Sequence, residues 1–490
     1  MKSFFHLIGD WLKRVFEEQK HSNQKSTILV LDGVRACAIL FVITFHINWT
    51  NQNYTRLWDS HTNPLASSVA IAGGAGVTLF FVLSGFLLFL PYAKVLLFTG
   101  RWPLARIFYL RRAMRIMPGY YISLIVLILW MAPQYLHLAH IDNLGQSLNV
   151  LMDSSQTKQP PNLNSLGLFL TFLMDSSRQT FRELNGPYWT LAVEWQFYMI
   201  LPLLALGILV LVKRVPSQRR LRAVSLCLFG LIAGGLCVRF FGLYFRDNPT
   251  ITFLIPRPAL NVISFFLFGI TGKYTEDFAV GMLASLCYVY AQSLPPEHPF
   301  VQTLHRISFR LWGIGILLLV FAAMWNFQSQ TTLAWPFLNP IMPYYNWLGE
   351  ILLAFAYGMC IMAILFGPHE LQRLFTWKPL RWIGMISYSL YIWHLPLILF
   401  FQAHIVSLFP PMNFYLLYTL YWVWLVVGII PFCVLYYAFI EQTGMRLGDH
   451  WRKAVETRHR TRIQAKNGII PANQETGAPH SVDKGEAVRS

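Results

Sequence analysis

Charged residues are scarce in this sequence, and its cysteines form no pattern. Asp, Glu, Lys and Arg make up 12% of the 490 residues, against 55% for hydrophobic residues. A chain of this size with so little charge is too apolar for a soluble protein. The six cysteines lie in or beside apolar runs, without the spacing of a disulfide framework or a metal site. We therefore expect inert, buried thiols and no bound metal.

No cleavable signal peptide is evident at the N-terminus. Apolar residues instead recur at helical spacing over residues 4–16, beside Lys13 and Arg14, which predicts a short helix on the membrane surface. The composition predicts three parts, of which the last is disordered: a cytoplasmic amphipathic segment, 1–27; a membrane domain, 28–446; and a polar cytosolic tail, 447–490.

Long hydrophobic runs dominate the rest of the chain. Several approach or exceed the roughly 20 residues that a helix needs to cross a bilayer, and Trp and Tyr at their ends fit interfacial belts. The sixth run is too long for one crossing, which predicts either a broken helix or a span preceded by a buried segment. About ten runs qualify as spans: 29–49, 70–96, 118–136, 188–212, 223–245, 261–292, 308–326, 346–366, 383–406 and 415–440.

Connections rich in Lys and Arg alternate with connections that are poor in them. The basic segments are 2–25, 101–115, 213–222 and 373–381, whereas 327–345 contains neither residue. Cytoplasmic loops carry this excess, so the net charge of +17 indicates topology rather than nucleic-acid binding. The predicted fold is all-α: a polytopic plasma-membrane protein, with about ten transmembrane helices around a polar chamber and both termini in the cytoplasm.

Arg35 and His46 stand in the first of these runs. Their eleven-residue offset brings the helix back to within about 20° of its starting direction and advances it about 16 Å, so both side chains share one face. An ionisable residue inside a membrane usually faces a cavity or a partner. The pair therefore predicts one wall of the chamber, with a cation near one end and an acid/base group near the other, suited to a long anionic substrate.

Glu194 lies in the fourth run, at a depth comparable to that of His46. This predicts an acid/base pair in which the carboxylate fixes the tautomer of the imidazole. The alternative is that both are separate interfacial residues that hydrogen-bond to the backbone.

Two further groups of polar residues have a functional and a plain interpretation. Arg112 and Arg115 are three apart on one helical face and suit phosphate oxygens, or they merely follow the positive-inside rule. The ninth run contains hydroxyls and a histidine that line the chamber, or that hydrogen-bond between helices. Residues assigned to the substrate chamber are Trp189, Ser387, Tyr388 and His394.

Taken in order, these segments resemble the acyltransferase-3 family of integral membrane acyltransferases. The resemblance covers roughly residues 31–446. Each motif is weak alone, but the ordered set is specific. The motifs are Leu31-Asp32-Gly33-Val34-Arg35 with His46; 76–86; Arg111-Arg112-Ala113-Met114-Arg115; Trp189-Thr190-Leu191 with Glu194; Gly281-Met282-Leu283; 386–391 with His394; and Tyr437 with Glu441.

The resemblance implies an acyl-CoA donor, usually acetyl-CoA, that enters from the cytoplasm, and O-acylation of a hydroxyl on a carbohydrate-type acceptor. It implies no permanently bound cofactor. The family's Arg-x10-His and Arg-x-x-Arg motifs fall on Arg35 with His46 and on Arg112 with Arg115. The chain departs from the family at Thr78, where many members carry Asp. The family's frequent extracytoplasmic hydrolase-like domain is not expected here, which implies either a lone enzyme or a separate extracytoplasmic partner.

The buried charges and the resemblance together predict one mechanism. Arg112 and Arg115, with Arg35, would hold the donor phosphates. His46 would act as general base on the acceptor hydroxyl, and Glu194 would orient it. The main alternative is a transporter or flippase for an anionic glycan or lipid, against which the lack of a visible internal repeat argues. A sensor or scaffold would leave the buried charges unexplained.

Overall fold

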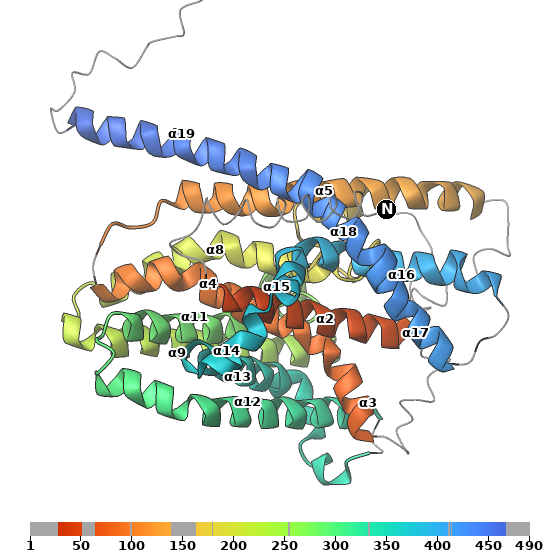
Figure 1. The fold of residues 1–490 in the computed structure, drawn as a ribbon, viewed down its shortest axis with the longest axis horizontal. Coiled ribbons are helices and arrows are strands. Elements are labelled where there is room, and N and C mark those ends of the chain that lie inside the picture. The colour runs from red at the N-terminus through yellow and green to blue at the C-terminus, as the bar shows by residue number, and fades with distance from the viewer. Residues whose placement is uncertain are drawn as a thin grey trace, which may run out of the picture.

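The computed structural model describes residues 28–466 except for 51–63, 99, 139–162, 179, 253–254, 332–333, 410–411 and 413. The expected amphipathic segment 1–27 and the end of the tail, 467–490, lie outside these residues. Within them every regular element is a helix, which confirms the predicted all-α class. Most of the long helices run side by side in one bundle (Figure 1).

The helices follow the apolar runs of the sequence. Two π-helical turns, Leu425–Ile429 and Tyr437–Glu441, interrupt the last long run. The α-helices are α2 Val30–Thr50, α3 Pro64–Ile71, α4 Gly76–Phe98, α5 Ala105–Leu138, α7 Leu163–Leu170, α8 Tyr188–Val212, α9 Ser217–Asp247, α10 Arg257–Leu267, α11 Thr275–Gln292, α12 Pro299–Thr331, α13 Tyr345–Phe366, α14 His369–Thr376, α15 Lys378–Met385, α16 Ser387–His404, α17 Phe414–Trp424, α18 Ile430–Tyr436 and α19 Gln442–Lys466.

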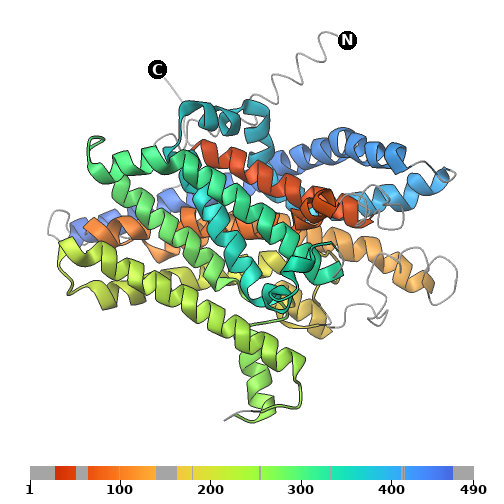
Figure 2. The same ribbon diagram turned by 90° about the horizontal axis from the view of Figure 1, so that it is seen from below.

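Nine helical stretches of the described chain are long and apolar enough to cross a membrane. The expected count of ten is therefore not confirmed. The difference lies in the run 261–292, where the structure has the first of the two predicted alternatives, a broken helix: α10 ends at Leu267 and α11 begins at Thr275. In Figure 2 the short helix α10 projects from the bundle, whereas α11 packs between α4, α9 and α13. Glu276 and Asp277 in its first turn are buried and make α11 too polar to count as a span by composition.

Small residues let the central helices approach closely. A Cβ atom on Gly85 of α4 would lie 2.1 Å from the backbone oxygen of Phe278 on α11. A Cβ on Gly281 would lie 2.1 Å from the backbone oxygen of Val82. Because apolar side chains gain little from leaving lipid, close backbone packing of this kind holds membrane helices together. The α4–α11 pair is thus a fixed centre around which the site is built.

The predicted disordered tail requires a correction at its start. Residues 447–466 continue the helix α19, which lies along α5 at the edge of the bundle (Figure 1). Arg452 pairs with Asp449 at 3.3 Å and with Glu456 at 3.2 Å. Such pairs, three and four residues apart, stabilise a helix that has little apolar surface to bury. The polar composition of this segment concealed its helical charge pattern.

Candidate active site

A cavity of about 80 Å³ opens between α2, α4, α5, α8 and α16. Six of the residues predicted from the sequence line it together, on four different helices. They are accompanied by hydroxyl groups from α4, α8 and α16. The polar residues of the lining are Arg35, Ser84, Arg112, Arg115, Thr190, Glu194, Tyr198, Ser387, Tyr388 and Tyr391. We call this space the arginine cavity.

The arginine cavity has an excess of positive charge. Its lining contains three guanidinium groups and one carboxylate. Arg35 pairs with Asp32 at 3.4 Å, one helical turn away, and Arg112 lies over the Tyr198 ring with its Cζ 5.8 Å from the centroid. The buried Nε of Arg112 has no hydrogen-bond partner among the described residues. A buried guanidinium with an unused donor is costly, so the cavity is suited to an anion that supplies acceptor oxygens.

Glu441 is a buried carboxylate near Arg35 and Arg115, although it does not line the arginine cavity. It ends the second π-helical turn and is 1% exposed. The Ser389 hydroxyl donates to its Oε2 at 2.9 Å, and the carboxylate interacts electrostatically with Arg115. Glu441 therefore offsets part of the cost of burying the arginines.

Glu194 contacts hydroxyl groups rather than His46. The Ser84 hydroxyl donates to the Glu194 Oε1 at 2.5 Å, and the Tyr198 hydroxyl donates to the same oxygen. In the described part of the chain no hydrogen bond joins Glu194 to His46. The structure thus places Glu194 in the wall of the arginine cavity, whereas the sequence suggested a position against the imidazole.

The partner of His46 is a second histidine. The Nε2 of His394, on α16, lies 3.2 Å from the Nδ1 of His46, and the ring centroids are 4.8 Å apart. The His394 Nδ1 lies 2.9 Å from the Leu390 carbonyl oxygen. The His46 Nδ1 lies 2.8 Å from the Val42 carbonyl oxygen. Each ring is therefore held to its own helix and to the other ring.

These contacts determine the tautomer of both rings. A carbonyl oxygen only accepts, so each Nδ1 carries a proton and donates it. The Nε2 of His394 is then an acceptor for the Nδ1 proton of His46, which is shared with the Val42 oxygen. This assignment, made from the hydrogen-bond network, leaves the His46 Nε2 with a free lone pair. A neutral imidazole in this state can act as a general base.

The histidine pair lies beyond the arginine cavity rather than in its lining. Tyr391 lies between the two groups, because it lines the cavity and its ring centroid is 5.8 Å from that of His394. Its hydroxyl shares a hydrogen bond of 2.5 Å with the Thr190 hydroxyl. Trp189, also predicted in the chamber, instead packs against Phe181 and Tyr274. The single chamber expected from the sequence is thus divided.

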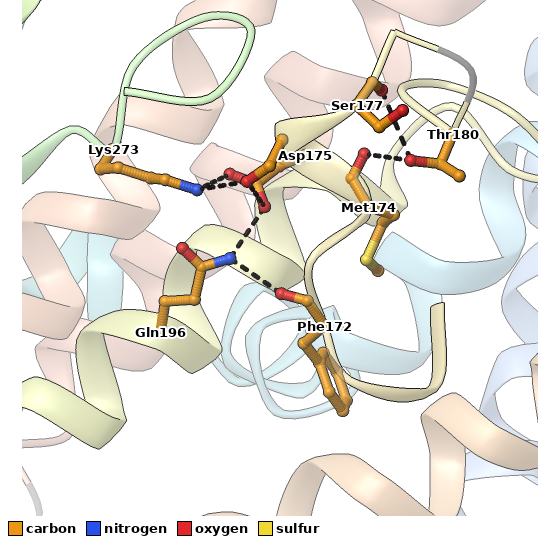
Figure 3. Close-up of polar contacts among 8 residues, drawn as sticks. Phe172, Met174, Asp175, Ser177, Thr180, Gln196 and Lys273 are labelled. Carbon is orange, nitrogen blue, oxygen red and sulfur yellow. Dashed lines mark hydrogen bonds and ion pairs between the residues drawn. The ribbon is translucent and has the colours of Figure 1, made fainter. Parts of the chain in front are cut away.

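A loop, residues 171–187, joins α7 to α8. Hydrogen bonds and an ion pair hold the first part of this loop in place (Figure 3). Lys273 pairs with the Asp175 carboxylate. The Gln196 Nε2 donates to that carboxylate and to the Phe172 carbonyl oxygen, both at 2.8 Å. The Thr180 hydroxyl donates to a backbone oxygen inside the loop at 2.8 Å. Nothing in the sequence indicated these contacts.

The end of the same loop lies against the helix of His394. The Asn185 Nδ2 donates to the Ile392 carbonyl oxygen at 2.8 Å. Arg182, whose φ of 64° is in the left-handed region, is close enough to His46 to interact with its charge. Sequence reasoning missed Arg182, because only the fold carries this loop to the histidine pair.

Replacement of Lys273 by methionine is expected to destabilise the protein by about 3–5 kcal/mol. The reason is that Asp175 is 2% exposed and would keep a buried charge without its partner. The measurement is unfolding of wild type and variant in mixed micelles with increasing SDS. The double variant D175N/K273M should recover most of the loss, and K213M, at an exposed lysine, serves as the control. Equal stability of wild type and K273M would contradict a structural role for the pair.

Thr78 is held by a carboxylate from another helix. Its hydroxyl donates to the Glu350 Oε2, on α13, at 2.6 Å. The chain therefore has a carboxylate group at the place where the sequence departs from the acyltransferase-3 pattern, although 272 residues separate the two positions. The sequence alone could not identify Glu350, because the contact is tertiary.

The fold and the site define a multi-pass helical membrane protein with a cavity lined by three arginines, close to a pair of buried or partly buried histidines. The chain belongs to the family described as "Acyltransferase domain", whose profile matches residues 28–438. This confirms the family that the motifs suggested.

Known relatives are similar over most of this chain. The putative peptidoglycan O-acetyltransferase YrhL of Bacillus subtilis is 26% identical over 379 residues, 75% of this chain and 48% of the relative. The peptidoglycan O-acetyltransferase OatA of Listeria monocytogenes is 25% identical over 375 residues, 75% and 49% of the two chains. The O-acetyltransferase OatA of Staphylococcus aureus is 25% identical over 392 residues, 79% and 53%. The chain thus spans about half the length of these relatives. No solved structure matches it.

Proposed function

We propose that this protein is an integral membrane O-acyltransferase that moves an acetyl group from acetyl-CoA to a hydroxyl of a carbohydrate acceptor. The observation that carries the proposal is the His46–His394 pair beside the arginine cavity, in a chain of the acyltransferase-domain family. The relatives named as O-acetyltransferases support the acetyl group, and those named for peptidoglycan support a glycan acceptor.

The arginine cavity is the donor end of the proposed site. The phosphates of acetyl-CoA would accept hydrogen bonds from Arg112 and Arg115, with Arg35 on the facing helix. These groups suit phosphate because a guanidinium presents several donors in a fixed plane. The pantetheine arm would extend along α2, on which Arg35 and His46 are about 16 Å apart along the axis. The thioester would reach His46 past Tyr391.

His46 carries out the proton transfer in this scheme. Its Nε2 takes the proton of the acceptor hydroxyl as the oxygen attacks the thioester carbonyl. When the carbon–sulfur bond breaks, the imidazolium returns the proton to the thiolate of CoA, so the step balances without another reactant. His394 is a positioning residue, because its Nε2 accepts from the His46 Nδ1 and holds the base in the required tautomer.

The topology belongs to the same proposal. We assign ten spans, counting the broken segment that ends in α11, a location in the plasma membrane and cytoplasmic termini. The alternation of connections rich in Lys and Arg with connections poor in them supports this orientation. It puts the arginine cavity toward the cytoplasmic pool of acyl-CoA and the end of α2 near His46 toward the outside.

The proposal is tested by the turnover of labelled acetyl-CoA by purified protein in lipid nanodiscs, with soluble peptidoglycan fragments as acceptors. We expect release of CoA together with label on the glycan. Transport of an anionic glycan across liposomes without any consumption of acetyl-CoA would overturn the proposal in favour of a transporter.

A further inference from the structure

A second cavity has Phe45, the neighbour of His46 on α2, in its lining. It has a volume of about 180 Å³, an order of magnitude above the roughly 10–15 Å³ that one water molecule requires. The residues that line it come from α2, the segment 71–75, α12 and α13, and all lie near the end of the bundle at which α2 ends. The arginine cavity has none of these residues in its lining. The two cavities are therefore separate sites.

The lining of the second cavity combines small, aromatic and polar groups. Alanines and glycine from 71–75 and 322–323 leave one part of the wall smooth. Phe45 and Tyr345 supply two aromatic rings, and Asn326, Gln330 and Glu350 supply two amides and a carboxylate. Sugars present apolar C–H faces and hydroxyl groups, which aromatic rings and planar acceptor–donor groups complement. A lipid chain would need no amide or carboxylate.

The polar groups of this lining make hydrogen bonds to other side chains and keep some hydrogen-bonding capacity unused. Glu350 accepts the Thr78 hydroxyl through its Oε2, so its Oε1 can accept from a ligand. The Gln330 Nε2 donates to the Asn326 Oδ1 at 3.0 Å. Among the described contacts this leaves the Asn326 amide group as a donor and the Gln330 oxygen as an acceptor.

The second cavity lies close to His46, the proposed general base. Phe45 forms its wall and also touches the edge of the His46 ring, with centroids 5.1 Å apart. Phe45 thus joins the second cavity to the proposed base, and Tyr391 joins the arginine cavity to His394, the partner of that base. The proposed reaction requires an acceptor hydroxyl within reach of this base, and the second cavity shares an aromatic wall with it.

We propose that the second cavity is the acceptor subsite and binds a sugar ring, with Glu350, Asn326 and Gln330 as hydroxyl and amide partners and Phe45 as the stacking surface. This inference rests on the proposed acyl transfer. It assigns the carbohydrate to a part of the molecule that has no residue in common with the arginine cavity.

The first test is the acceptor dependence of turnover in the variants E350Q, N326A and Q330A. The probe is the disaccharide N-acetylglucosaminyl-N-acetylmuramic acid. Loss of one hydrogen bond to a sugar should raise the acceptor KM about tenfold, and up to a hundredfold for E350Q. We expect the KM for acetyl-CoA to stay constant and kcat to change less than about threefold. The control is Q302A, at an exposed position near the other end of α12. An unchanged acceptor KM in all three variants would overturn the inference.

The second test does not depend on turnover. Ala72 lines the second cavity, so A72C should react with a thiol reagent, and the disaccharide should slow the reaction at least fivefold, as read by mass spectrometry of the peptide. S293C, at an exposed position away from the cavity, should react equally with and without the sugar. Protection without consumption of acetyl-CoA would retain the subsite and reject the acyltransferase. Turnover without protection would reject the subsite alone.

Discussion

Replacement of His46 by alanine is expected to lower acetyl transfer by about 10²–10⁴-fold. The Nδ1 of His46 donates its proton to the Val42 oxygen and to the His394 Nε2. The Nε2 of His46 is therefore unprotonated and can accept the proton of a substrate. Without it the acceptor hydroxyl would have to attack while still protonated. The binding of acetyl-CoA should be unchanged, because the arginine cavity lies on the far side of Tyr391. The measurement is kcat with labelled acetyl-CoA, together with donor affinity by calorimetry.

The matched control for this variant is H404A. His404 ends α16, is exposed, and stacks on Phe400 with centroids 4.6 Å apart. Its loss should leave kcat within about twofold, as is usual for a surface substitution. A well-folded H46A protein with wild-type turnover would eliminate His46 as the base.

Replacement of Arg112 and Arg115 together by glutamine is expected to raise the KM for acetyl-CoA by about 10²–10⁴-fold. Each hydrogen bond to a charged phosphate contributes roughly 1.5–3 kcal/mol, and both side chains line the arginine cavity. The effect should appear in donor binding more than in folding, because Glu441 loses Arg115 but keeps its electrostatic interaction with Arg35. Equilibrium binding of CoA to wild type and variant provides the direct measurement.

Arg111 provides a control at the same place in the sequence. It precedes Arg112 on α5 but is exposed and does not line the cavity. The R111Q variant has the same change of charge and should bind CoA with an affinity within about threefold of wild type, the size expected of an exposed charge. Equal weakening by R111Q and by the double variant would indicate a general electrostatic effect rather than specific phosphate contacts.

The sequence predicted the features that depend on a short stretch of chain. The apolar runs predicted nearly all of the long helices, and the length of 261–292 predicted that this run could not be one simple crossing. Charges three and eleven residues apart indicated which side chains share a helical face, because helical geometry fixes those directions. Arg112 and Arg115 accordingly line one cavity with Arg35.

Contacts between distant helices could not be derived in this way. His46 and His394 are 348 residues apart, and equal depth alone favoured Glu194 as the partner just as well. Depth restricts a residue along the membrane normal but says nothing about the position around the bundle. The division of the site by Tyr391 and the placement of Glu350 against Thr78 have the same origin, since both depend on which helices are neighbours.

The π-helical turn that ends at Glu441 also has a consequence for how sequences of this family are compared. A π turn holds about one residue more than an α turn. Deletion of a single residue from 437–440 would restore the α-helical register and turn the preceding and following segments by about 100° relative to each other. Glu441 would then lose its alignment with Ser389 and Arg115. A one-residue gap at this point in an alignment would therefore mark the loss of a counter-charge to the arginines, and should be treated as a change of function rather than as noise.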